Sequence, residues 1–598
     1  QIAGDMLPGA TIDQRIATGF HRNTLINEEG GTDPEQFRVE SVVDRVNTTG
    51  IVFLGLTVGC AQCHEHKYDP ISQREYYQLY AFLNNADEPK LDVPSEEQIR
   101  QGLVQKRDEL RAQIAGLEKD FAAQESEYLA SLTAWEKSLT EDDKKKLPAE
   151  VLNAVNLAPE MRDDRHRKDL TDYYRKQEAA RKKFPVLDQI AGLRASEPQF
   201  VTTMVMQERA APRETHIHIR GDFLRHGAQV VPAVPAVLPG LPETLSNPGR
   251  LDLARWLVDP RNPLTPRVTV NRVWQKYFGR GIVETENDFG TQGIPPTHPE
   301  LLDWLAAEFV APTVNPLPQA GRDDTGELAS AGDGTASAAP PSSPLNLGGE
   351  ASAAWSLKNL HALIVNSATY RQASKFRKEL AEVDPANKLY ARQSRLRIDA
   401  EIVRDAALAA SGLLNETIGG PSVNPPQPDG VFEFTQDKKA WNTAVGADRY
   451  RRGMYTYLWR SSPYPAMTVF DFPDANVACT RRSRSNTPLQ SLTLANDQQF
   501  MEFAQGLAVR ILRDEKAVDS SRLRFAFRVC MAREPVAAEQ QRLESLLKQQ
   551  RGEFAANLKQ AEELTPPLVP VRATVQEFAA WTAVARVLLN LDEFITRE

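Results

Sequence analysis

The sequence predicts a mainly α-helical, multidomain protein that has a helical hairpin or coiled-coil arm and a small β element in its middle. Three observations indicate this class. Apolar residues at helical spacing recur along much of the chain. Strand-like alternation is confined to residues 200–206 and 215–219. The length of 598 residues suits two to four domains.

Residues 1–95 form the first predicted domain, a compact helical module. Charged and polar residues follow one another at helical spacing here, and the motif Cys-X-X-Cys-His lies at 60–64. Residues 1–5 resemble the middle of a helix and carry neither an initiator Met nor a helix cap. We therefore expect the chain to be a fragment of a longer precursor, whose signal peptide was lost with the missing N-terminus.

Residues 96–197 form the predicted arm. Apolar side chains recur three, four or seven positions apart, as in a coiled coil, at Ile99, Leu103, Leu110, Ile114, Leu117 and Phe121. A polar break at 141–148 separates this run from a second helical run at 170–193. The two runs predict a helical hairpin that serves as a spacer or a docking arm.

Residues 198–245 form the predicted β segment, followed by an extended Pro-rich connector at 231–240. Residues 246–598 return to helical spacing and form the predicted C-terminal domain. Within it, residues 311–354 are rich in Ala, Gly, Ser, Pro and Asp and poor in large apolar residues. Such a segment cannot bury enough surface to order itself, which predicts a disordered insertion.

Charge and hydropathy exclude two classes of protein. The formal net charge of −9 argues against a dedicated nucleic-acid binder, because a phosphate backbone requires a basic face. No apolar run reaches the eighteen or so residues that a membrane-spanning helix needs. We therefore expect neither a nucleic-acid partner nor a membrane span.

The motif Cys60-Ala61-Gln62-Cys63-His64 is the pattern of covalent c-type haem attachment. Two thiols form thioethers with the haem vinyl groups, and the imidazole that follows reaches the iron as the proximal ligand. The chain has only four Cys, so two of them at this spacing before a His are informative. The cofactor prediction is haem c on Cys60 and Cys63, with His64 as the ligand of the haem iron.

Two other interpretations of this segment remain open. Cys60, Cys63, His64 and His66 are also ligand types for Zn or Fe, although one short loop would have to supply the whole set. The two Cys could instead form a redox or structural disulfide. The remaining cysteines, Cys479 and Cys530, lie in apolar surroundings and are expected to be free and buried.

A sixth haem ligand would decide between electron transfer and small-molecule chemistry. The candidates are His21, Met204, Met206, His216 and His218, and the sequence does not rank them.

A rival site would use the carboxylates and imidazoles of the first module, as in a non-haem metal or acid-base enzyme. This set comprises Glu28, Glu29, Asp33, Asp44, His64, His66 and Asp69. The alternative interpretation is a solvated polar face with helix caps.

Two clusters in the second half are further binding candidates. Arg481, Arg482 and Arg484 could hold an oxyanion, or form an ordinary salt-bridged cluster. The second cluster is an aromatic set that comprises Tyr450, Tyr455, Tyr457, Trp459 and Tyr464. These side chains could stack on sugar rings, although the alternation at 455, 457 and 459 also suits a half-buried strand.

Several runs resemble a known pair of domains. Residues 19–24, 27–31, 44–46 and 59–70 are similar to the planctomycete cytochrome-c-type domain of unknown function. Residues 271–274, 287–290, 297–305, 367–371 and 486–492 are similar to its usual C-terminal partner domain. The resemblance implies a haem protein, but neither domain has an established activity.

The function predicted from these observations is that of a c-type haem-binding protein with a redox or electron-transfer role, located in the periplasm or outside the cell. Its redox partner protein is not indicated. One alternative is a haem-free metal or carboxylate enzyme, such as a hydrolase whose partner is a polysaccharide or another extracellular polymer. The other is a non-catalytic binding or scaffold protein.

Overall fold

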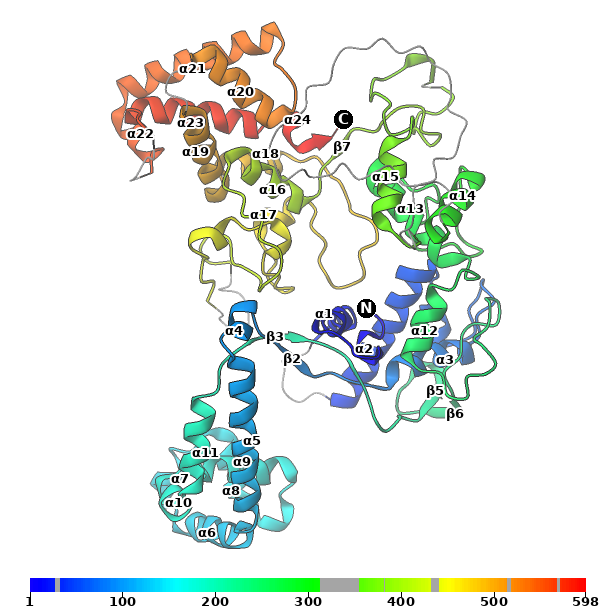
Figure 1. Ribbon diagram of the computed structural model, residues 1–598, viewed down its shortest axis with the longest axis vertical. Helices are drawn as coiled ribbons and strands as arrows, with labels where there is room; N and C mark the ends of the chain where they lie inside the picture. Colours follow the sequence, from blue (N-terminus) through cyan, green and yellow to red (C-terminus); the bar gives the residue numbers. More distant parts are fainter. Residues whose placement is uncertain are drawn as a thin grey trace. The chain divides into compact units, whose positions relative to one another are not determined.

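The computed structural model describes residues 1–26, 33–311, 354–380, 382–431, 440–513, 518–566 and 571–597. It contains 24 α-helices within these ranges and only short strands, which confirms the mainly α class (Figure 1). Residues 312–353 of the predicted insertion lie outside the described residues. The chain divides into two compact units. The first comprises Gln1–Pro8, Asn23–Asp87 and Glu208–Glu598, and the second Gly9–Arg22 and Glu88–Gln207.

The first unit begins with a helical module around the Cys-X-X-Cys-His motif. Its elements are η1 (Gly4–Met6), α2 (Pro34–Thr49), the π-helical turn η3 (Gly50–Leu54), the 3-10 turn η4 (Val58–Gln62), α3 (Gln73–Asn84) and β1 (Ala86–Asp87). The side chain of Asp33 caps α2 by accepting from the N–H of Glu35 at 2.8 Å. Ser72 and Glu75 form a capping box that starts α3.

The same unit continues with a hairpin and helices that complete the module's core. These are β4 (Gln207–Glu208), β5 (Thr215–His218), η6 (Ile219–Gly221), β6 (His226–Val230) and α12 (Arg250–Leu257). Buried side chains of α2, α3, η3 and η4 pack against Leu253, Trp256 and Leu257 of α12. The module therefore closes its core with a helix about 170 residues downstream of α3.

Arg250 ties α12 to the N-terminal segment. Its side chain is fully buried and donates to Asp5 at 2.6 Å, to Glu208 at 2.8 Å and to the carbonyl of Ile2 at 2.9 Å. A buried guanidinium is stable only when such partners replace water. This network fixes the first residues of the described chain onto α12.

The C-terminal part of the first unit contains two further cores. The smaller one joins α13 (Leu264–Phe278), α14 (Pro299–Val310) and α15 (Leu357–Asn366) around Trp274 and Phe278. The larger core is formed by most of the elements that follow α15 in the chain. These elements are η7 (Lys378–Leu380), β7 (Leu396–Arg397), α16 (Ala400–Ser411), η8 (Gly446–Tyr450), η9 (Gly453–Tyr455), α17 (Pro465–Thr468), α18 (Pro488–Asn496), α19 (Gln498–Leu512), α20 (Asp519–Met531), α21 (Ala537–Ala556), α22 (Leu558–Glu563), α23 (Val575–Leu589), α24 (Asp592–Ile595) and β8 (Thr596–Arg597).

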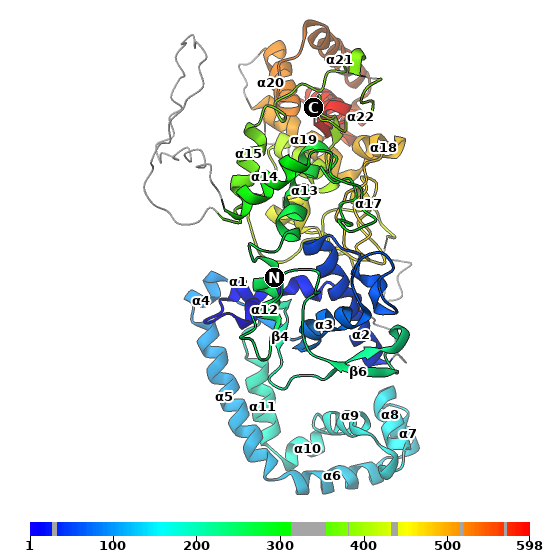
Figure 2. The same cartoon turned by 90° about the vertical axis from the view of Figure 1, so that its right-hand side faces the viewer.

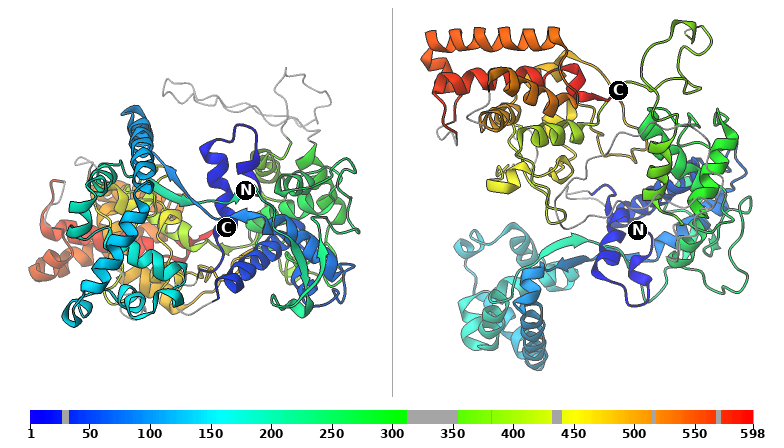
Figure 3. Two further views of the ribbon diagram at one scale, coloured as in Figure 1. Left: turned by 90° about the horizontal axis from the view of Figure 1, so that it is seen from below. Right: turned by 45° about the horizontal axis from the view of Figure 1, so that its top comes forward.

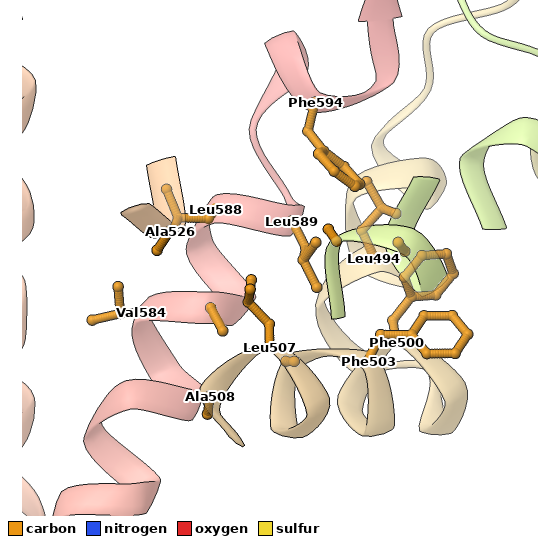
Figure 4. Close-up of a cluster of buried hydrophobic side chains, with 14 of the residues drawn as sticks. Leu494, Phe500, Phe503, Leu507, Ala508, Ala526, Val584, Leu588, Leu589 and Phe594 are labelled. Carbon is orange, nitrogen blue, oxygen red and sulfur yellow. The ribbon is translucent and has the colours of Figure 1, made fainter. Parts of the chain in front are cut away.

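Helix α23 forms the centre of the larger core. It contacts α19 and α21 along its length, and the three helices lie side by side (Figure 3). Leu589 lies on the side of Leu507 of α19, and Leu588 lies beside Ala526 of α20 (Figure 4). An apolar helix covered on several sides is typical of the middle of a helical bundle.

The second unit contains the arm. Its elements are α1 (Ile12–Ala17), η2 (Thr18–Arg22), β2 (Lys90–Val93), α4 (Glu96–Arg100), α5 (Leu103–Ala122), α6 (Glu125–Ser138), α7 (Glu141–Lys144), α8 (Ala149–Asn156), η5 (Pro159–Met161), α9 (Asp164–Tyr174), α10 (Glu178–Lys183), α11 (Val186–Ala195) and β3 (Val201–Met204). Helices α5 and α11 pack together, and α6 to α10 form the end of the arm (Figure 2).

The arm differs from a simple hairpin of two helices. The predicted run at 170–193 is divided among α9, α10 and α11. Pro185 explains the last break, because it cannot continue the helix that ends at Lys183. Phe121, Tyr128 and Phe184 pack edge to face in the core of the arm's end.

Both predicted strand segments are present, but they form separate ribbons. In the second unit, β3 pairs antiparallel with β2, from Val201 opposite Val93 to Met204 opposite Lys90. In the first unit, β5 pairs antiparallel with β6. The domain boundaries drawn from the sequence stay a prediction.

Candidate functional site

The Cys-X-X-Cys-His loop follows two tight helical turns. Gly55 ends the π-helical turn in a left-handed conformation with φ of 62°, and η4 then carries Cys60. A Cβ at Gly55 would approach Val268 and Phe289, so this turn requires glycine. Cys60 and Cys63 are both exposed, and all four cysteines are free thiols in the structure.

His64 is exposed, and its Nδ1 lies 2.6 Å from the carbonyl oxygen of Glu65. A carbonyl oxygen only accepts, so we assign the proton to Nδ1. The lone pair of Nε2 is then available to a ligand. A hydrogen bond to the other ring nitrogen is the usual way in which a protein sets the tautomer of a metal-binding histidine.

The loop is attached to α3 and to the β5–β6 hairpin. The carbonyl oxygen of Gln62, between the two cysteines, accepts from Tyr77 at 3.1 Å and from Gln73 at 3.0 Å. Gly221 lies so close to the loop that a Cβ there would stand 2.7 Å from the Sγ of Cys63. These contacts fix the backbone while the thiols stay accessible.

A pocket of about 350 Å³ adjoins the loop. Gln62 and Gly221 line it together with Phe223 and residues of α2, including Asp44 and Asn47. Burial raises the pKa of Asp44, with nearby Arg45 and Arg460 acting in the opposite direction. The pocket has polar and apolar walls, and Gln62 is the residue of the Cys-X-X-Cys-His motif that lines it.

His66 has a different environment from His64. Its side chain is buried, and its Nδ1 accepts from the backbone N–H groups of Asp69 at 2.7 Å and Tyr68 at 3.3 Å. These bonds shape the turn that follows the motif. Among the described residues no group of three or more His, Cys, Asp or Glu is arranged to hold a metal ion. The Zn or Fe site with His66 stays a prediction.

The rival set of carboxylates is dispersed where the structure describes it. Asp33 caps α2, Asp44 lines the pocket, and Asp69 accepts from the N–H of Thr291 at 2.8 Å. Glu28 and Glu29 lie outside the described residues. Of the set, the structure brings together only His66 and Asp69, with Nδ1 and Oδ2 3.7 Å apart.

Asp69 connects the first module to the C-terminal part. A Cβ at Gly290 would lie 2.5 Å from Asp69 Oδ2, so the carboxylate of Asp69 packs directly against the backbone of Gly290 and leaves no room for a larger residue. Nearby, Arg272 donates to the carbonyls of Ile51 and Val52 at the end of the π-helical turn. Burial lowers the pKa of Arg272 to about 10, which leaves it charged at neutral pH.

The sixth-ligand candidates fall into the two units. His21 and Met206 are buried within the second unit, where Met204 lies on β3. His216 and His218 lie on β5 in the first unit, and each stacks with His226 of β6. The structure therefore places only the two β5 histidines in the same unit as the Cys-X-X-Cys-His loop.

His218 makes the first unit sensitive to acid. Burial, followed by the charges of His226 and Arg38, lowers its pKa to about 4 from the ordinary 6.5, whereas Glu35 acts in the opposite direction. An unfolded chain binds this proton near pH 6.5 and the folded chain only near pH 4, so acid favours unfolding. We expect the free energy of unfolding to fall by about 2 kcal/mol between those pH values, less than the full shift because His226 beside it is exposed.

Urea unfolding at pH 7 and pH 4.5 measures this effect. The variant His218→Gln should lose this part of the pH dependence, and the exposed control His361→Gln should retain it. Equal pH dependence in His218→Gln and the unmodified protein would contradict the assignment.

The arginine cluster is largely engaged in ion pairs. Arg482 pairs with Glu401 at 2.8 Å, and Arg484 pairs with Asp399 at 3.5 Å and donates to a backbone carbonyl. This favours the salt-bridged interpretation over an oxyanion grip by all three guanidinium groups. Cys479 nearby is exposed rather than buried as expected, because it lies in a loop outside any helix or strand. Cys530 is half-buried.

The aromatic set does not form the suggested strand. Tyr450 and Tyr455 lie in the 3-10 turns η8 and η9, and Thr456 makes only an isolated bridge with Val423. Tyr457 and Trp459 stack on each other, and the hydroxyl of Tyr464 donates to a carbonyl in the interior. The set therefore contributes mainly to packing.

Fold and site together define a mainly α multidomain protein whose N-terminal module presents two exposed thiols and an oriented imidazole. Two family models match this chain, one at its N-terminus and one over most of its second half. Residues 1–88 match the family described as a protein of unknown function (DUF1549), and residues 249–315 and 351–547 match a second protein of unknown function (DUF1553). The chain thus carries these two domains in N-to-C order, as in the paired-domain family.

Neither the curated proteins nor the solved structures contain a match to this chain. None of the helices in the described ranges is both long enough and apolar enough to cross a lipid bilayer.

Proposed function

We propose that this protein binds one haem c covalently through Cys60 and Cys63, with His64 as the proximal ligand, and acts as a redox or electron-transfer component. The observation that carries the proposal is the exposure and hydrogen bonding of the Cys-X-X-Cys-His loop. Its two thiols are free and exposed, and the Nδ1 of His64 is bonded to the carbonyl of Glu65, which leaves Nε2 for iron.

The residues present fit the chemistry of attachment. Each thiol adds across one haem vinyl group, so that the S–H hydrogen goes to carbon and a C–S bond forms without net oxidation. Exposed thiols allow this addition, which buried ones would not. The bound haem would supply a one-electron redox couple whose potential depends on the axial ligands and the surrounding polarity.

Two further features support the fit. A pocket of about 350 Å³ reaches the loop at Gln62, the residue that precedes Cys63. The bonds from Tyr77 and Gln73 to Gln62 fix the backbone between the two thiols. A loop held in this way orients its ligands before the cofactor arrives.

Because c-type haem is attached outside the cytoplasm, the proposal places the mature protein in the periplasm or outside the cell. Its partner there would be a redox protein that exchanges electrons with the haem.

Optical redox titration tests the proposed role. The protein is produced with a secretion signal in a host that matures c-type cytochromes, then reduced with dithionite and reoxidised with ferricyanide. We expect a Soret band that shifts reversibly. His64→Ala should change the position of this band or lower the haem content, whereas His166→Ala, on α9 of the arm, should change neither. A Soret band that does not respond to reductant would contradict the redox role.

A further inference from the structure

A second pocket, of about 530 Å³, opens in the C-terminal part of the first unit. It is lined by residues of the loop 468–483 and by Glu286 and Asn287. These two residues lie shortly before Gly290, which contacts Asp69. Both segments fall within the ranges matched by the DUF1553 model. A pocket of this size lies within the usual range for small-molecule sites. The proposed haem site uses none of these residues.

The wall of this pocket is fixed by internal ion pairs. Asp471 accepts from the N–H of Ser485 at 2.7 Å and pairs with Arg397. Arg482 pairs with Glu401 at 2.8 Å, and its guanidinium lies 5.3 Å from the ring centre of Phe472. Because these charges are neutralised by protein partners, they shape the pocket rather than attract a charged ligand.

The same loop contains two residues in a left-handed conformation. Asp471 has φ of 60° and Ala475 has φ of 59°. This region is unfavourable for residues other than glycine, above all for Ala, which has no side-chain hydrogen bond to compensate. Such strain is concentrated at functional sites, where the surrounding structure holds it in place.

The polar groups left for a ligand include both acceptors and donors. Asp474 uses one carboxylate oxygen for the N–H of Asn476 at 3.0 Å, and Glu286 presents a second carboxylate. The side-chain oxygen of Asn287 accepts from Arg272 at 3.4 Å, which leaves its NH₂ group as a donor. Arg481 adds an exposed guanidinium, and Phe472 adds an apolar ring.

This lining discriminates between classes of ligand. An anion would meet the carboxylates of Glu286 and Asp474. A purely apolar ligand would cover those carboxylates without replacing their hydrogen bonds to water. A ligand rich in neutral hydroxyl groups can donate to the carboxylates and accept from Asn287 and Arg481.

We propose that this pocket binds a neutral saccharide. Hydroxyl groups of the sugar donate to Glu286 and Asp474 and accept from Asn287, and the apolar face of a sugar ring lies against Phe472. The assignment does not depend on the presence of haem.

Calorimetric titration of the purified full chain tests the proposal. The probes are the neutral trisaccharides of glucose, xylose and mannose, with trigalacturonate as the anionic comparison. We expect one or more neutral trisaccharides to bind and trigalacturonate not to bind. Glu286→Gln should weaken binding about tenfold, the effect of one lost hydrogen bond to a charged group. The matched control Glu563→Gln, an exposed glutamate on α22, should leave binding unchanged.

Cys479 provides a second readout because its exposed thiol lines the pocket. The rate at which iodoacetamide alkylates Cys479, followed by peptide mass, should fall severalfold in the presence of the bound trisaccharide. Three results would overturn the proposal. They are no binding of any neutral probe, binding that neither protects Cys479 nor responds to Glu286→Gln, and binding of trigalacturonate alone.

Discussion

Replacing Arg250 with Met is expected to lower the free energy of unfolding of the first unit by about 4 kcal/mol. The fully buried guanidinium is the shared partner of Asp5, Glu208 and the carbonyl of Ile2. Its removal leaves the buried carboxylate of Asp5 without its cation, which costs more than the lost attraction alone. Urea denaturation followed by circular dichroism measures the effect.

Arg255 on the same helix is the matched control. Its side chain is mostly exposed and lies 3.7 Å from Asp252, a pair that contributes little at the surface. Arg255→Met should change the free energy of unfolding by at most about 0.5 kcal/mol. Similar losses in both variants would show that the buried network does not hold the N-terminal segment on α12.

Substituting Ala for Gly290 is expected to destabilise the first unit by about 3 kcal/mol. The added Cβ would lie 2.5 Å from the Oδ2 of Asp69, which is buried and bonded to Thr291. Relief of this clash would have to move the carboxylate of Asp69 away from its bonds to Thr291, in the turn that begins at His66. We therefore also expect a lower yield of haem-loaded protein from Gly290→Ala.

Gly552→Ala is the control for this substitution. Gly552 lies in α21, and a Cβ there would meet no atom within 4 Å. Alanine favours a helix over glycine by up to about 1 kcal/mol, so this variant should be slightly more stable. If Gly290→Ala were as stable as the unmodified protein, the close contact between the Asp69 carboxylate and the backbone of Gly290 would be wrong.

The sequence predicts local features of this fold well, because periodicity and capping are local properties. The long apolar run from Ile99 to Phe121 corresponds to α4 and α5, and the alternating segments correspond to β3 and β5. The last break in the second helical run follows from Pro185 and could have been predicted from that residue. The pairing of β3 with β2 could not, since the two strands are more than 100 residues apart in the chain.

The candidate site shows the same limit. The spacing of Cys60, Cys63 and His64 identifies the motif, but not the bond that sets the tautomer of His64. In the sequence, Arg272 and Gly290 stand out only as parts of the runs 271–274 and 287–290 that resemble the partner domain. Their roles depend on carbonyls and a carboxylate more than 200 residues away in the chain. Their place in runs that resemble the partner domain is the only sequence signal that could have indicated these two residues.

The most direct test of the central claim is the intact mass of the denatured protein together with its pyridine haemochrome spectrum. The protein is produced with a secretion signal in a host that matures c-type cytochromes. The account predicts one covalently bound haem, absent from Cys60→Ala/Cys63→Ala and retained in the control Cys479→Ala. Mature, folded protein that carries no covalent haem under these conditions would contradict it.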